Sequence, residues 1–193
     1  MRKDNLKARL AYSTISQLSY IVLGALLINE TAFIGSSMHI AMHAFGKITL
    51  FFCAGAIMVA AHKTEISQMR GLGRTMPITM AAFFIGSLSI IGLPPMGGMW
   101  SKWFLVLGTV EAELYIPLAV LLISSLLNIA YLLPVSIRAF YITESEKDKL
   151  ESSTVIKEAP WPCLVAISIT SLGCIALFIF PEPLYQLVEL IFT

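Results

Sequence analysis

The sequence predicts an all-α integral membrane protein with five transmembrane spans, one of them discontinuous. Of its 193 residues, 57% are hydrophobic and only 13% are charged, whereas a soluble domain carries about 25% charged residues. Several apolar runs are long enough to cross a hydrocarbon core of about 30 Å. One of these runs is interrupted by prolines and glycines, which cannot continue a regular helix. These three observations together define the fold class.

The chain divides into spans and short connections that form a single transmembrane domain. We expect spans near residues 12–28, 36–61, 78–110, 116–141 and 161–180. Residues 29–35 are predicted as a loop, and residues 62–77 as an irregular charged connector. Residues 143–159 are predicted as a charged cytoplasmic loop, and the residues after 180 as a short amphipathic helix at the membrane interface. The polar side of the first span, including Ser16 and Ser19, is interpreted as a helix-packing surface.

The third span is broken at residues 92–98, where the sequence reads GLPPMGG. The residues that define the break are Gly92, Pro94, Pro95, Gly97 and Gly98. The two apolar pieces on either side are each too short to span a bilayer comfortably, although together they can. Irregular backbone at membrane depth is tolerated only where it is buried in protein or lines a cavity. We therefore expect this break in the interior of a bundle.

The positive charges predict an orientation and isolate two lysines. With the N-terminus in the cytoplasm, eleven of the 13 Lys and Arg residues fall in cytoplasmic segments: Arg2, Lys3, Lys7, Arg9, Lys63, Arg70, Arg74, Arg138, Lys147, Lys149 and Lys157. This is a strong positive-inside bias, and we expect a prokaryotic cytoplasmic membrane. The two remaining lysines, Lys47 and Lys102, both fall within spans. No Asp or Glu falls within an expected span, so their partners are predicted to be water, another subunit or a part of the protein outside this sequence.

Three ionisable residues form a polar stripe on the second span. His39, His43 and Lys47 lie at i, i+4 and i+8, so on a helix each is turned by about 40° and raised by about 6 Å from the last. An ionisable residue at membrane depth costs at least about 2.5–3.5 kcal/mol and indicates a functional site facing protein or a water-filled path. Lys102 follows one to two turns after the break in the third span.

This pattern favours proton transfer. Burial disfavours the charged form of lysine, so a buried amine can take up and release a proton, and histidine titrates near neutral pH. His39, His43 and Lys47 therefore suit a proton wire in which waters bridge successive groups. Broken helices expose backbone dipoles at the ion sites of transporters, which makes Lys102 a candidate second relay.

Other interpretations of the same residues are open. The histidines can be structural hydrogen-bonding groups, and Lys102 can extend its amine to an interface. A metal site is disfavoured because HIAMH lacks the glutamate of H-E-x-x-H and a third ligand. A haem is disfavoured because histidines one turn apart on one face cannot bind opposite sides of one iron.

The sequence shows no sign of a cofactor or of nucleic-acid binding. The cysteines, Cys53, Cys163 and Cys174, lie in apolar runs without a C-x-x-C pair, which predicts buried free thiols. No nucleotide or iron–sulfur motif is present, so we expect no cofactor and no metal. The net charge of +1 excludes nucleic-acid binding by bulk electrostatics.

Three motifs in order resemble a known family. They are LKARLAYSTISQLSYIVLG, MHIAMHAFGKITLFFCAG and GLPPMGGMWSKW. The resemblance covers about residues 6–140 and is to the antiporter-like proton-conducting membrane subunits. These occur in respiratory complex I (the L, M and N types), in Mrp sodium/proton antiporters (the A and D types) and in membrane-bound hydrogenases.

The resemblance implies a fold and a set of roles. The family fold has about fourteen helices in two inverted five-helix repeats, each with one broken helix, and this chain resembles most of the second repeat. By position, Lys47 is similar to the lysine on the long helix, with His39 and His43 as neighbouring relays. Lys102 is similar to the lysine of the second broken helix, where some members have glutamate. The first repeat, with its glutamate–lysine pair, is not in this sequence, which leaves a fragment, a split subunit and a truncated reading frame open.

The function implied is translocation of protons, or of sodium coupled to protons, as part of a multisubunit respiratory or antiporter complex in the bilayer. The chain would be at most a transport subunit of a redox-driven complex similar to NADH:quinone oxidoreductase, without a redox centre of its own. Its partners would be other membrane subunits, including one that supplies the first repeat. The alternatives are a non-conducting structural or assembly subunit and a redox subunit that binds haem or quinone.

Overall fold

The computed structural model describes residues 3–141 and 156–192, and these are helical throughout apart from short connections and an isolated bridge between Asn5 and Glu65. The elements are α1 (Leu6–Leu26), α2 (Glu30–Ala61), the 3₁₀ turn η1 (Ile66–Met69), α3 (Leu72–Thr75), α4 (Pro77–Ile91), α5 (Gly98–Glu111), α6 (Tyr115–Phe140), α8 (Trp161–Ile179) and α9 (Glu182–Glu189). The predicted all-helical class, with one discontinuous helix formed by α4 and α5, is confirmed. Most of the predicted charged loop 143–159 lies outside the described residues.

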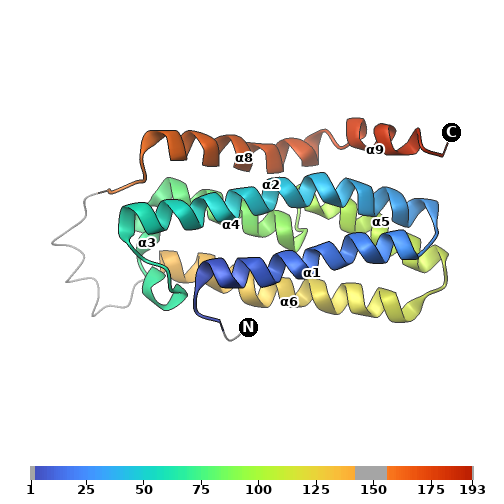
Figure 1. Ribbon diagram of the computed structural model, residues 1–193, viewed down its shortest axis with the longest axis horizontal. Helices are drawn as coiled ribbons and strands as arrows, with labels where there is room; N and C mark the ends of the chain where they lie inside the picture. The colour runs from blue at the N-terminus through green and yellow to red at the C-terminus, as the bar shows by residue number, and fades with distance from the viewer. Residues whose placement is uncertain (1–2, 142–155, 193) are drawn as a thin grey trace.

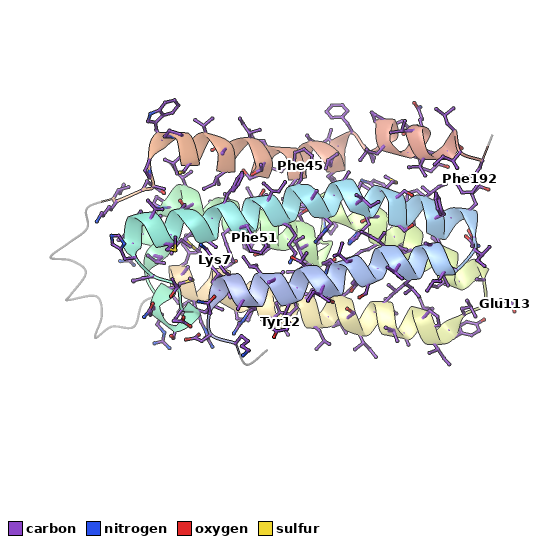
Figure 2. All side chains as sticks on the ribbon, viewed as in Figure 1. Lys7, Tyr12, Phe45, Phe51, Glu113 and Phe192 are labelled. Carbon is purple, nitrogen blue, oxygen red and sulfur yellow. The ribbon has the colours of Figure 1, made fainter. Side chains whose placement is uncertain are left out.

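The long helices run back and forth along one axis of the molecule (Figure 1). Three of the described helices, α2, α6 and α8, are long and apolar enough to cross a membrane. The N-terminal segment meets the connector after α2, where the Leu6 amide donates to the Thr64 carbonyl at 3.0 Å. Lys7 lies toward this end, whereas Glu113 and Phe192 lie at the other (Figure 2). The basic N-terminal and connector segments therefore share one end of the bundle.

Two asparagines start α1 and α2 earlier than expected. The Asn5 side chain accepts a hydrogen bond from the Ala8 amide at 3.0 Å, and the Asn29 side chain accepts one from the Ala32 amide at 3.1 Å. Both are N-caps, which satisfy amides that a helix start leaves unpaired. The predicted loop at residues 29–35 is wrong, because the cap at Asn29 turns the chain within a few residues and α2 begins at once.

Glu158 caps the start of α4 from the far side of the sequence. Its carboxylate accepts from the Ile78 amide and from the Thr79 hydroxyl, both at 2.7 Å. The N-cap residue of α4, Met76, provides no side-chain hydrogen bond. A carboxylate is stabilising at the positive end of a helix, so the segment before α8 is fixed against the start of the broken helix.

Helix α2 is the centre of the bundle. It packs against α1, α4, α5, α8 and α9, and half of its most apolar stretch is buried, compared with 17% in α6 and in α8. Helix α9 covers part of α2, where Val188 packs against Ile34, Met38 and Met42. A short helix at the tail is therefore confirmed, while its placement at a membrane interface stays a prediction. The central position of α2 places its polar stripe inside the bundle.

Glycines let α5 approach the first half of α2 closely. A Cβ on Gly35 would lie 2.7 Å from the Leu105 amide nitrogen, and one on Gly108 would lie 2.6 Å from the Ala32 Cβ. No real Cβ is found this close to another atom, so side chains here would push the two helices apart. This contact brings the start of α5 against the stripe of α2.

We predict opposite effects for the same substitution at two positions of α2. Gly35→Ala should destabilise the protein by about 1–3 kcal/mol, because overpacked interiors must shift backbone. Gly55→Ala, whose Cβ would meet nothing within 4 Å, should stabilise it by about 0.5–1 kcal/mol, since alanine favours a helix interior over glycine. The thermal midpoint of unfolding in detergent measures both. Equal shifts for the two variants would contradict the close α2–α5 contact.

Candidate functional site

The break between α4 and α5 is held by backbone contacts with α4 and with α8. Gly92 ends α4 with φ +85, in the left-handed region, and its amide donates to the Leu88 carbonyl at 2.9 Å. The Gly97 amide donates to the Cys174 carbonyl of α8 at 3.0 Å. A Cβ on Gly98 would overlap the Ser89 carbonyl, so the start of α5 lies directly against the end of α4. The sequence-predicted break at 92–98 thus spans two close backbone contacts.

Lys102 is paired with the end of the helix that precedes it. Its Nζ donates to the Ile90 carbonyl at 2.9 Å and to the Ile91 carbonyl at 2.8 Å, and the residue is 9% exposed. The last carbonyls of a helix lack intrahelical donors and carry a partial negative charge. The ammonium also lies 5.1 Å from the ring centroid of Tyr20. Lys102 therefore does not extend to the surface.

Gly92 leaves the space through which the Lys102 side chain passes. A Cβ at Gly92 would lie 2.8 Å from Lys102 Cδ. Glycine is therefore favoured at this position for two reasons. It adopts the left-handed backbone at the helix end, and it leaves room for the Lys102 side chain to reach the carbonyls of Ile90 and Ile91.

Lys47 is also held by a backbone carbonyl. Its Nζ donates to the Leu10 carbonyl of α1 at 3.2 Å, and the residue is 5% exposed. Within the described residues, neither Lys47 nor Lys102 has a carboxylate partner at ion-pair distance. The sequence predicted partners in water, another subunit or a segment outside this chain, but the structure gives both amines partners on the chain's own backbone.

His39 connects three helices. Its Nδ1 lies 2.8 Å from Ser101 Oγ of α5, and its Nε2 lies 3.1 Å from Gln17 Oε1 of α1. The ring is 2% exposed and lies 5.6 Å from the Tyr20 ring. Since Tyr20 also lies under Lys102, this tyrosine places the stripe of α2 next to the amine of α5.

His43 continues the stripe from His39 toward Lys47. The two imidazole rings are stacked, with centroids 5.8 Å apart and planes at 14°. His43 Nε2 is buried and makes no hydrogen bond in the part of the chain that the structure describes. The structure thus brings together all four ionisable residues that the sequence singled out.

The sequence interpretation missed three polar residues of this site: Gln17, Tyr20 and Ser101. Gln17 and Tyr20 are buried on one face of α1, whereas Ser19 points outward. The spacing of Ser13, Gln17 and Tyr20, at i, i+4 and i+7, marks a single helix face and was the available signal. Ser101 is separated from His39 by 62 residues, so only the fold shows their contact.

A polar row extends from Tyr20 to a cavity between α1 and α6. Ser13 bonds to the Tyr131 hydroxyl, which donates to Asn128, and the Asn128 amide donates to the Tyr20 hydroxyl at 3.4 Å. Ser13, Asn128 and Tyr131 line a cavity of about 220 Å³ together with Arg9. The site around Lys102 therefore continues through polar side chains toward an open groove.

A second cavity, of about 510 Å³, lies beside Lys102 between α5 and α6. It is lined mainly by apolar side chains, including Leu93, Trp103 and Val106.

Among the described residues, no three His, Cys, Asp or Glu side chains are grouped as metal ligands. Cys53 and Cys174 are buried free thiols as predicted, while Cys163 is only half-buried.

The described residues thus form a helical bundle with one broken helix, a buried lysine paired with the end of α4 and a buried His/Lys stripe on α2. Residues 1–128 match the family described as the transmembrane region of NADH:quinone oxidoreductase/Mrp antiporter subunits. The chain belongs to this family.

Curated relatives come from two kinds of complex. The chain is 37% identical over 180 residues to the N-type subunit of the NADH-quinone oxidoreductase of Desulforudis audaxviator, with 90% of this chain covered. It is 34% identical over 181 residues to the D-type subunit of the Na(+)/H(+) antiporter of Alkalihalophilus pseudofirmus, with 93% covered. In both comparisons it spans 36% of the relative's length.

Solved structures share the fold. The Mrp complex of a Dietzia species superposes with a TM-score of 0.83 at 20% identity, over 97% of this chain and 42% of that one. Respiratory complex I of Thermus thermophilus gives 0.81 at 22% identity, over 97% and 39%. The arrangement of helices is therefore that of antiporter-like subunits.

We predict that Gly92→Ala disturbs the Lys102 site. A left-handed backbone costs a non-glycine residue about 1–2 kcal/mol, and the new Cβ would press on the Lys102 stem. The thermal midpoint in detergent should fall, whereas it should rise for Gly55→Ala in the open part of α2. A Gly92→Ala variant as stable as Gly55→Ala would contradict the described route of the lysine.

Proposed function

We propose that this chain is an ion-translocating module of a multisubunit membrane complex, in which protons, or sodium ions coupled to protons, cross the bilayer. The observation that carries this proposal is the pairing of two buried amines with backbone carbonyls, next to two stacked imidazoles. Lys47, His43 and His39 follow one another along α2, and both His39 and Lys102 contact the ring of Tyr20. We propose that these four residues are the proton relay.

The chemistry of the amine partners supports this role. A carboxylate partner favours the charged form of a lysine, whereas the carbonyls of Leu10, Ile90 and Ile91 are dipoles without net charge. Each amine can therefore lose its proton without leaving an uncompensated anion in the membrane. His43 Nε2, which makes no hydrogen bond to the described residues, is available to a water that bridges to Lys47.

The partners and setting follow from the relatives. One is a subunit of a quinone oxidoreductase and another a subunit of a sodium/proton antiporter, so we propose that this chain works beside other membrane subunits. One of these, or another segment, would supply the first repeat. The basic N-terminus and connector lie at one end of the bundle, which supports a cytoplasmic N-terminus in a prokaryotic cytoplasmic membrane.

A structural or assembly role is the second candidate, because the same carbonyl contacts would also hold two cations in a purely structural bundle. The two candidate functions differ in whether the buried lysines must release their protons. Arginine tests this, since its guanidinium donates hydrogen bonds like lysine but stays protonated in proteins.

We predict that Lys102→Arg and Lys47→Arg each slow translocation at least about tenfold while the complex still assembles, since removing a proton-transferring group commonly costs more than this. The measurement is the initial rate of proton movement into proteoliposomes that contain the assembled complex, with and without sodium. Lys102→Ala and Lys47→Ala should be equally impaired.

Lys7→Arg is the matched control, because Lys7 is exposed near the basic end of α1 and should leave the rate unchanged. An unchanged rate in both buried-lysine variants, with normal assembly, would overturn the transport proposal and favour the assembly role. A rate that depends on sodium in the parent complex would identify coupled sodium transport.

A further inference from the structure

The hydrogen bonds around His39 depend on where its protons are. The ring contacts one group that only accepts, Gln17 Oε1, and one that can donate or accept, Ser101 Oγ. The Ser101 hydroxyl also lies 3.1 Å from the Gly98 carbonyl at the start of α5. Since a hydroxyl has one proton, Ser101 donates either to His39 or to Gly98, and never to both.

Only one protonation state satisfies all of these contacts at once. In the imidazolium form, Nε2 donates to Gln17, Nδ1 donates to Ser101, and Ser101 donates to Gly98. When the neutral ring has its proton on Nε2, Nδ1 needs a donor and Ser101 must turn away from Gly98. When the proton is on Nδ1, Nε2 needs a donor, which the Gln17 carbonyl oxygen cannot be.

The Gln17 amide has the missing donor. Gln17 Nε2 is buried and makes no hydrogen bond among the described residues. A half-turn of the amide exchanges its oxygen and nitrogen and presents this N–H to His39 Nε2. Each neutral form of His39 thus has its own orientation of Gln17 and of the Ser101 hydroxyl.

We infer that Gln17 and Ser101 are positioning residues that accommodate the two tautomers of His39, so that the ring passes a proton from one nitrogen to the other. When the partner of one ring nitrogen turns away, that nitrogen takes a proton from a hydronium ion of the water that links the relay and gives the imidazolium. The proton on the other nitrogen then passes to a water on that side, which leaves the neutral ring with its tautomer inverted. Gln17 and Ser101 turn at each transfer and neither gains nor loses a proton. This inference rests on the proposed function of the stripe.

The groups that face His39 have compatible chemistry. Tyr20 of α1 and His43 of α2 contact the ring, and the amine of Lys102 of α5 lies over the same Tyr20 ring. The Ser101 hydroxyl couples the tautomer of His39 to the break, because it also lies 3.1 Å from the Gly98 carbonyl. Ser101 directly precedes Lys102.

Two substitutions should move the neutral tautomer in opposite directions. Gln17→Met removes the partner of Nε2 and leaves Ser101 to accept from Nδ1–H, so the proton should move to Nδ1. Ser101→Ala removes the partner of Nδ1 and leaves Gln17 to accept from Nε2–H, so the proton should move to Nε2. Loss of one hydrogen bond should change the ratio of the two tautomers about tenfold.

Solid-state NMR of the assembled complex in lipid, with ¹⁵N-labelled histidine, measures this ratio from the ring nitrogen shifts. His39 is assigned by the signal that His39→Gln removes. Ser87→Ala is the control, because Ser87 is a buried serine whose hydroxyl makes no hydrogen bond within the described residues, and it should leave the ratio unchanged. Ser101→Thr keeps the hydroxyl and should retain the parent ratio.

The same variants should slow translocation in proteoliposomes about tenfold, except for Ser101→Thr and Ser87→Ala. Tautomer ratios that do not change, or that change in the same direction for Gln17→Met and Ser101→Ala, would overturn the inference. Changed ratios with an unchanged translocation rate would also overturn it.

A substitute variant and a separate readout keep this test independent. If Gln17→Met does not assemble, Gln17→Leu replaces it, which also removes the partner of Nε2 and should likewise move the proton to Nδ1. Failure of the proposed function is recognised separately, by Lys102→Arg and Lys47→Arg variants that translocate normally. The tautomer ratio is read without transport and stands apart from that result.

Discussion

The structure depends on one constraint: the last carbonyls of α4 and the ammonium of Lys102 must both find partners away from water. A helix that ends at membrane depth exposes carbonyls at a cost of several kcal/mol each, and a buried ammonium is similarly costly. Here the ammonium and the carbonyls are each other's hydrogen-bond partners, since Lys102 Nζ lies 2.9 Å and 2.8 Å from the carbonyl oxygens of Ile90 and Ile91. The broken helix and its lysine are therefore one unit, and Gly92 makes room for it.

The remaining helices place the stripe of α2 beside this unit. Close approach at Gly35 and Gly108 sets α5 against the first half of α2, so that Ser101 reaches His39. Helix α1 completes the site with polar side chains on its inward face. The relay we propose therefore runs along one helix and then crosses to another through contacts made by neutral side chains, which can reorient as protons pass.

Sequence patterns predicted what is local and missed what is long-range. The break at GLPPMGG and the spacing of His39, His43 and Lys47 follow from neighbouring residues, and both were found in the structure. The carbonyl partner of Lys47 and the contact of Ser101 with His39 join segments far apart in the chain, so no local pattern indicated them. The Glu158 cap on α4 is long-range in the same way, whereas the cap at Asn29 is a local contact with Ala32 and is visible in the sequence as an asparagine before the apolar run.

The most direct test is a cryo-EM map of the assembled complex in lipid at a resolution that shows ordered water. The account predicts both amines in the protein interior, with Lys102 at the carbonyls of Ile90 and Ile91 and Lys47 at that of Leu10, and water in contact with His43. An amine that lies among lipid headgroups, or a dry row of side chains between His43 and Lys47, would contradict it.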